Sequence, residues 1–109
     1  MDMAVQEFFE IPLAPEPQRL AISLGGVDYV LKLRYNARLE LWILDVADAE
    51  EHQLVSGIPL VTGVDLLGQY RHLGFKGALI AYEKDSDGSP TFDTLGVTGG
   101  LVFATEAMP

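Results

Sequence analysis

The sequence predicts a mostly β protein: a small antiparallel β-barrel or sandwich of about six or seven strands with one short α-helix. Three observations predict this class. Apolar and polar residues alternate in short runs, segments rich in glycine or proline separate the runs, and most connections are too short for the crossovers between parallel strands. In a chain of 109 residues, 49% of them hydrophobic, such strands form a single core.

The N-terminal part is predicted to be an extended arm with an edge strand (residues 1–17), followed by a single β-barrel-like domain (residues 18–109). Residues 8–13 form a β-type run, and Pro12 confines this run to a sheet edge because proline has no N–H to donate. The following segment, residues 14–17, contains two prolines. It is therefore predicted to be a stiff, extended spacer.

The next two runs predict a β-hairpin. Residues 20–24 and residues 27–33 alternate between apolar and polar side chains, and only Gly25 and Gly26 separate them. Two period-two runs joined by a two-residue glycine loop are typical of a tight hairpin.

A third strand is expected over residues 39–46, where the run Leu-Trp-Ile-Leu is continuously apolar. Such a run indicates burial on both faces, so this strand lies at the centre of a sheet or meets a partner. A return strand follows over residues 53–61. Gly57, Pro59 and Gly63 are predicted to be structural turn residues that set the path of the chain after it.

The only predicted helix covers residues 64–73. Leu66, Leu67, Tyr70 and Leu73 lie at helical spacing, Thr62 or Asp65 is available as a cap, and Gly74 follows the last turn. Two more strands are expected, over residues 77–83 and 101–105, with a polar loop at residues 85–90.

Composition excludes several classes of function. The chain has no cysteine, so it forms neither disulfides nor thiolate metal sites. A net charge of −9 disfavours binding to nucleic acid and to anionic membranes. No membrane span and no signal peptide is evident in the sequence, so the protein is expected to be soluble and to stay inside the cell that makes it.

No motif predicts a catalytic, cofactor or metal site. The run Asp-Ser-Asp-Gly at residues 85–88 begins like a calcium loop, but the twelfth position is Gly96 instead of a glutamate. His52 and His72 lie far apart, and Ser56 lacks the first glycine of a nucleophile elbow. The chain is therefore predicted not to be an enzyme and to need no cofactor.

The expected activity is association with other proteins. An exposed extended arm can add a strand to an open sheet edge, so the candidate interface residues are the apolar ones of the arm, Phe8, Phe9, Ile11 and Leu13. The alternative is a soluble small-ligand-binding β-barrel whose cavity is lined by Trp42, Tyr29 and Phe103, although aromatic residues in small β domains more often fill the core.

Several stretches in this order resemble the baseplate plug family of contractile-tailed phages, of the kind described for a cyanophage. They are Phe-Glu-Ile-Pro-Leu at residues 9–13, Leu-Gly-Gly-Val-Asp-Tyr at 24–29, Trp-Ile-Leu-Asp-Val at 42–46, Gly-Ile-Pro-Leu-Val-Thr-Gly with Asp-Leu-Leu at 57–67, and Gly-Val-Thr-Gly at 96–99. The resemblance spans about residues 8–105.

The resemblance implies a virion structural protein without catalytic or cofactor residues. It further implies a compact β domain in the tail baseplate, close to the central hub. Its partners would then be other baseplate proteins associated with the hub, tube, spike or sheath. A phage protein of this kind is made in the host cytoplasm.

Overall fold

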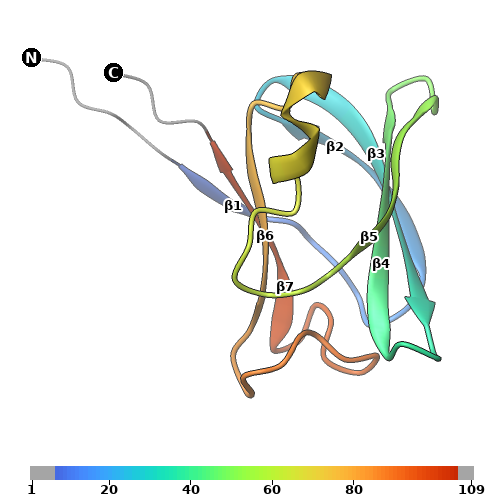
Figure 1. Cartoon of the computed structure of the whole chain (residues 1–109), viewed down its shortest axis with the longest axis vertical. Helices are drawn as coiled ribbons and strands as arrows, with labels where there is room; N and C mark the ends of the chain where they lie inside the picture. The colour runs from blue at the N-terminus through green and yellow to red at the C-terminus, as the bar shows by residue number, and fades with distance from the viewer. Residues whose placement is uncertain (1–6, 106–109) are drawn as a thin grey trace, which may run out of the picture.

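The computed structural model describes residues 7–105 and contains seven strands in two antiparallel sheets (Figure 1). A three-stranded sheet has the order β1-β7-β6, and a four-stranded sheet has the order β2-β3-β4-β5. The two sheets pack as a sandwich, which confirms the mostly β prediction. The elements are β1 (Phe8–Glu10), β2 (Gln18–Leu24), β3 (Val27–Asn36), β4 (Leu41–Asp48), β5 (Gln53–Pro59), the 3-10 helix η1 (Gly68–Leu73), β6 (Gly77–Glu83) and β7 (Gly99–Thr105).

The four-stranded sheet is a meander of hairpins between neighbours in the sequence. Gly25 and Gly26 form the predicted two-residue loop between β2 and β3, and their φ angles of 62° and 85° match a type I′ turn, which needs positive φ at both positions. Strand β4 lies between β3 and β5. Trp42, Ile43 and Leu44 are all buried although they alternate between its two faces, so the predicted central strand is confirmed.

The three-stranded sheet joins the beginning of the described chain to its end. Strand β1 pairs antiparallel with β7, with Phe9 opposite Phe103, and β7 pairs antiparallel with β6. The edge strand that was predicted near Pro12 is therefore present, but it is shorter than the apolar run and ends at Glu10. The first six residues of the predicted arm lie outside the described residues.

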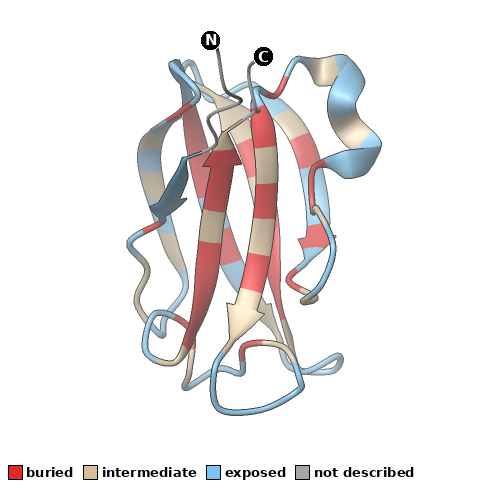
Figure 2. Ribbon diagram, turned by 90° about the vertical axis from the view of Figure 1, so that its left-hand side faces the viewer, coloured by how far each residue is buried: buried red, intermediate tan, exposed pale blue. Residues whose placement is uncertain are grey.

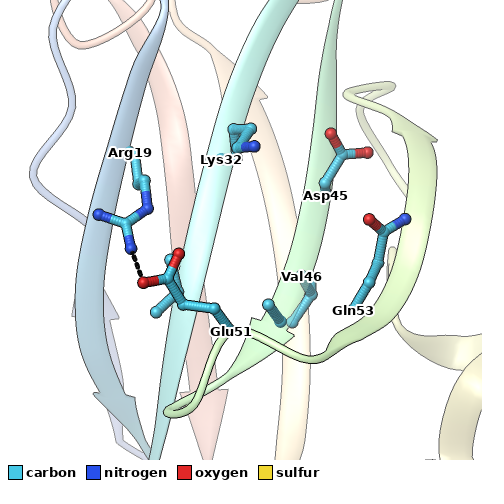
Figure 3. A pocket seen from close by; sticks show the side chains of 8 residues that line it. Arg19, Lys32, Asp45, Val46, Glu51 and Gln53 are labelled. Atoms are coloured by element: carbon cyan, nitrogen blue, oxygen red, sulfur yellow. Dashed lines mark ion pairs between the residues drawn. The ribbon is translucent and has the colours of Figure 1, made fainter.

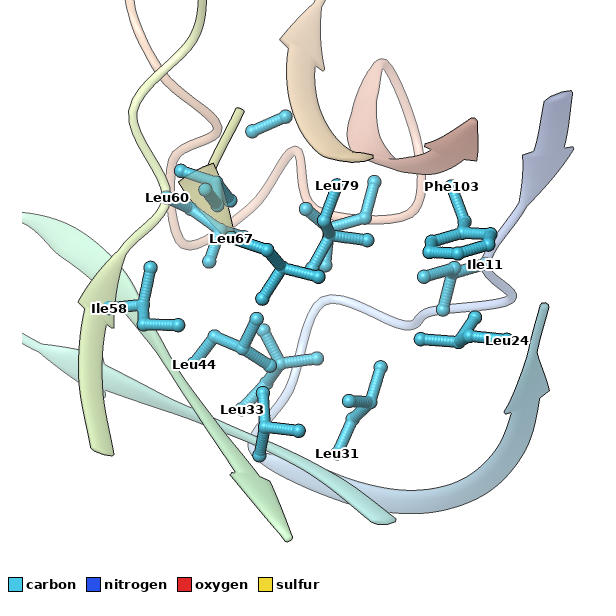
Figure 4. Packing of buried hydrophobic residues seen from close by; sticks show 14 of the residues in the cluster. Ile11, Leu24, Leu31, Leu33, Leu44, Ile58, Leu60, Leu67, Leu79 and Phe103 are labelled. Atoms are coloured by element: carbon cyan, nitrogen blue, oxygen red, sulfur yellow. The ribbon is translucent and has the colours of Figure 1, made fainter. Parts of the chain in front are cut away.

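The core fills the space between the two sheets (Figure 4). Side chains from β3, β4 and β5 meet side chains from β6, β7 and the segments that precede β2 and η1. Burial of each large apolar side chain contributes about 1.5–3 kcal/mol, so this layer dominates the stability of the fold. Figure 4 labels ten of these side chains: Ile11, Leu24, Leu31, Leu33, Leu44, Ile58, Leu60, Leu67, Leu79 and Phe103.

The predicted α-helix at residues 64–73 is wrong in kind and in extent. Residues 62 and 65 form isolated bridges with β6, and the Leu66 N–H donates to the Leu79 carbonyl at 2.7 Å. The Asp65 carboxylate, predicted as a helix cap, accepts the N–H groups of Leu67 and Leu79 at 3.0 Å each. Because β6 takes these backbone groups, only a six-residue 3-10 helix forms afterwards, and Gly74 ends it as predicted.

Candidate protein interface

The outer face of the four-stranded sheet is charged, and Figure 3 shows one of its ion pairs, between Arg19 and Glu51. Arg34 Nε donates to Asp45 Oδ2 at 2.9 Å, and Arg19 pairs with Glu51. Asp45 Oδ1 also accepts the hydroxyl of Ser56 at 3.0 Å and the N–H of Gly57 at 2.8 Å. The depression that Arg19, Lys32, Asp45 and Glu51 help to line has a volume of only about 80 Å³, which is too small for a typical organic ligand.

The carboxylate of Asp45 is fully engaged by partners within the chain. Partial burial raises the pKa of Asp45, but the hydrogen bonds from Arg34, Gly57 and Ser56 outweigh burial and hold that pKa below its ordinary value of 3.8. The carboxylate therefore stays ionised and occupied by partners within the chain.

The outer face of the three-stranded sheet is apolar. In antiparallel sheets, residues directly opposite each other point to the same side. Leu79 and Phe103 point into the core, so their neighbours along the strands point outward. We call this surface the apolar sheet face; it consists of Phe8, Ala78, Ile80, Val102 and Ala104.

Figure 2 looks directly at this side of the molecule, with the strands of the three-stranded sheet in front. Phe8 is 63% exposed, and Ile80 and Val102 are only half-buried. No other element among residues 7–105 packs over this side of the sheet in Figures 1 and 2. Ala104 is buried at 2% exposure, and no element of residues 7–105 covers Phe8, Ile80 and Val102 on this face.

A hydrogen bond between side chains limits the apolar sheet face at one end. The hydroxyl of Tyr82 donates to Glu10 Oε2 at 2.6 Å and so links β6 to β1 across β7. Gly100 on β7 leaves the space for this bond, since a Cβ there would lie 2.8 Å from Glu10 Oε2 and 3.0 Å from the Tyr82 oxygen. The hydrogen bond to Glu10, burial and the nearby negative charges raise the pKa of Tyr82 to about 12.

The structure separates the four predicted interface residues. Phe8 and Phe9 are 63% and 51% exposed on β1, at the edge of the sheet. Ile11 is buried in the core at 1% exposure, and Leu13 is half-buried against the core. Ile11 is therefore closed to a partner in the folded chain, because β1 ends before it and the chain then passes between the sheets.

Sequence reasoning missed the contribution of β6 and β7 to this surface. The signal was present in the run Ala-Leu-Ile-Ala-Tyr at residues 78–82, in which the residues on both faces of the strand are apolar or aromatic. A continuous apolar run is typical of a strand that is covered on both sides. In this chain only one side is covered by the core.

Gly25, Gly26 and Gly63 lie between elements as predicted turn residues, whereas Gly57 lies inside β5. Gly25, Gly26, Gly57 and Gly63 all have positive φ angles, between 62° and 85°. Pro59 is the last residue of β5 and lies opposite Ile43.

The three residues of the alternative ligand cavity belong to the core. Trp42, Tyr29 and Phe103 are 0%, 5% and 1% exposed. Trp42 donates from Nε1 to the Thr91 carbonyl at 2.8 Å, and Phe92 stacks on its ring with centroids 5.6 Å apart. These contacts occupy the ring faces and edge that a ligand would have to reach.

One group of possible metal ligands occurs among the described residues, in the turn between β4 and β5. Ligand atoms of Asp48, Glu50 and His52 lie within 4.8 Å of one another. Asp48 Oδ1 accepts the backbone N–H groups of Glu50 at 2.9 Å and His52 at 2.8 Å. These bonds account for the group as a hydrogen-bonded turn.

Comparison with known proteins bears on the function of this surface. The helix in residues 7–105 is too short and too polar to cross a membrane. None of the curated proteins matches the sequence. A family model described as cyanophage baseplate Pam3 plug gp18 matches residues 8–106, which is nearly the whole chain. The resemblance noted in the sequence is thereby confirmed, with a structural role in the baseplate and a place in the virion tail. The chain belongs to the family of the cyanophage baseplate plug.

Proposed function

We propose that this protein is a non-enzymatic, plug-like subunit that docks near the central hub or tube of a phage tail baseplate. It is made in the host cytoplasm and joins the hub, tube, spike or sheath-associated proteins during assembly. Its action is mechanical: the domain occupies a defined position, and its release or rearrangement accompanies contraction of the tail. Membership of the plug family supports the baseplate role.

The observation that carries the proposal is the difference between the two outer faces. The four-stranded sheet presents charged side chains, two pairs of which form ion pairs within the chain, whereas the three-stranded sheet presents the apolar sheet face. Uncovered apolar surface bordered by polar residues is typical of protein interfaces. Phe8 is the most exposed residue of this surface and is expected to contribute most to binding.

The proposal is tested with tagged protein in cells producing a phage that lacks the natural copy of this chain. Phe8→Glu places a charge on the apolar sheet face without removing a core side chain. Leu39→Glu is the matched control, because Leu39 is similarly exposed at 57% and lies in the turn between β3 and β4 of the other sheet. Recovery of hub, tube or sheath proteins with the parent and with Leu39→Glu, but not with Phe8→Glu, is expected.

Assembly of intact, infective particles in the complete absence of the chain would overturn the proposed baseplate function. Undiminished recovery of tail proteins with Phe8→Glu, while the variant melts at the same temperature as the parent, would overturn the assignment of the apolar sheet face as the interface.

A further inference from the structure

Strand β1 has one open edge among residues 7–105. The Ile11 N–H donates to the Leu101 carbonyl at 3.0 Å, and the Thr105 N–H donates to the Glu7 carbonyl at 2.9 Å. Because backbone groups alternate in direction along a strand, the groups of Glu7, Phe9 and Ile11 face β7. The N–H and C=O groups of Phe8 and Glu10 consequently point away from the sheet, where no described strand lies beside them.

The open edge is short and has a defined end. Pro12 continues the same alternation after Phe8 and Glu10, and it has no N–H to offer. A neighbouring strand can therefore form up to four hydrogen bonds, all with Phe8 and Glu10. This length is enough for a specific short partner and too little for unlimited edge-to-edge growth.

The side chains of β1 indicate which residues a partner strand would carry. Phe8 and Glu10 lie on the outer face of the sheet, and Phe9 lies on the opposite side with 51% of its surface exposed. Apolar residues opposite Phe8 and Phe9 would cover these rings. No ion pair within residues 7–105 includes Glu10, whose carboxylate accepts the neutral hydroxyl of Tyr82, so a Lys or Arg opposite Glu10 would supply the opposite charge that this carboxylate lacks.

Charge also decides against a second copy of the chain. Antiparallel pairing of two β1 strands about Phe9 would place each Glu10 opposite the Phe8 ring of the other copy. It would also bring together two chains that each have a net charge of −9. A basic partner meets attraction at the same place.

We propose that β1 receives an added strand from another baseplate protein, an extended segment that presents two apolar residues and a Lys or Arg to Phe8, Phe9 and Glu10. This inference rests on the proposed function and names the recognition mode of the same surface. The added strand extends the three-stranded sheet, and its outer side chains continue the apolar sheet face. Main-chain hydrogen bonds supply binding, and the alternating side chains supply specificity.

Amide hydrogen exchange tests the inference at the backbone. The probe is a preparation of tails from phage that lack this chain, to which labelled protein is added back; after exchange in D₂O the protein is released and examined by NMR. In the free protein we expect rapid exchange at Phe8 and Glu10 and slow exchange at Phe9 and Ile11. In bound protein we expect at least tenfold slower exchange at Phe8 and Glu10.

Each other outcome contradicts the inference in a recognisable way. Binding to tails with Phe8 and Glu10 as fast as in the free protein refutes strand addition and leaves the proposed function intact. Absence of binding to tails refutes the proposed function as well. Slow exchange at both amides in free protein of doubled mass identifies a second copy as the occupant, which overturns our choice of partner.

A pair of variants separates the contribution of the Phe8 backbone N–H to binding from that of the Phe8 ring. Phe8→Ala removes the ring alone, whereas Phe8→Pro removes the ring and the outward N–H without touching a bond to β7. If that N–H is used, Phe8→Pro weakens binding to the tails about fivefold more than Phe8→Ala, the effect of one hydrogen bond worth about 1 kcal/mol. Equal binding by the two variants, with equal melting temperatures, would argue against strand addition.

Discussion

Replacement of Gly96 by alanine tests how closely residues 13 and 14 pack against the loop that precedes β7. Gly96 has a φ angle of 79°, and a Cβ built there would overlap the Leu13 carbonyl oxygen and lie 2.7 Å from its carbon and 3.1 Å from Ala14 N. These are backbone atoms, so no side-chain rotation relieves the overlap. The control is Gly63→Ala, because Gly63 has a φ angle of 85° and open space around its Cβ position.

Both variants incur the cost of a left-handed backbone, and only Gly96→Ala also incurs the cost of steric overlap. A left-handed backbone costs an L-residue about 1–2 kcal/mol, and this is the whole expected loss for Gly63→Ala. Overlap in a packed site costs about 1–3 kcal/mol more, so Gly96→Ala is expected to lose about 2–5 kcal/mol in total. For a domain of this size each kcal/mol lowers the melting temperature by about 4–6 °C.

Urea unfolding, followed by the fluorescence of the single tryptophan, measures both losses. A free energy of unfolding that is about 2 kcal/mol lower for Gly96→Ala than for Gly63→Ala is expected. Equal losses for the two variants would refute the close approach of residues 13 and 14 to Gly96.

Three further predictions concern charged and titrating residues. Glu10→Gln should move the pKa of Tyr82 from about 12 toward its ordinary value of 10.0, measured by absorbance of the tyrosinate. Because the pKa of Tyr82 is raised in the folded state, the stability linked to Tyr82 is complete below pH 10 and is lost as the pH rises from 10 to 12. Asp45→Asn should lower the free energy of unfolding at pH 7 by about 1–2 kcal/mol. Since the pKa of Asp45 is lowered in the fold, its contribution is present above pH 3.8 and is lost as the pH falls further, so parent and variant should converge in acid denaturation curves. Glu40→Gly should raise the melting temperature. Glu40 has a φ angle of 54°, and the strain that glycine removes from the folded backbone exceeds the entropy that it adds to the unfolded chain by about 0.5 kcal/mol.

Much of the fold could be predicted because its signals are local. The hairpin around Gly25 and Gly26 needed only two alternating runs and a loop that permits positive φ. The run Trp42 to Leu44 identified the central strand without knowledge of its neighbours. The predicted bounds of β6, residues 77–83, agree with the structure.

The predicted helix shows where local signals fail. Leu66 and Leu67 lie at helical spacing, but they are buried because residues 62–66 run along β6 and the Asp65 carboxylate binds its backbone. Hydrogen bonds to a strand that follows more than ten residues later outweigh a weak intrinsic preference for helix.

The positions of the four candidate interface residues could not be told apart from the sequence. The sequence of the N-terminal run marks Phe8, Phe9 and Ile11 as apolar without distinguishing them. Pairing of β1 with β7 decides that Ile11 enters the core and that Phe8 stays at the surface. The partner strand for this choice lies more than ninety residues away in the sequence.

The sequence by itself determined the β class, most strand positions, the tight hairpin and the family, because period-two patterns and turn residues act over a few neighbouring residues. Only the tertiary structure decided that the strands form a sandwich, that a 3-10 helix replaces the α-helix, and that the outer face of one sheet is charged and that of the other apolar. The physical reason is that a strand has two faces. Which face is buried depends on partners that are distant along the chain and meet only in the folded protein.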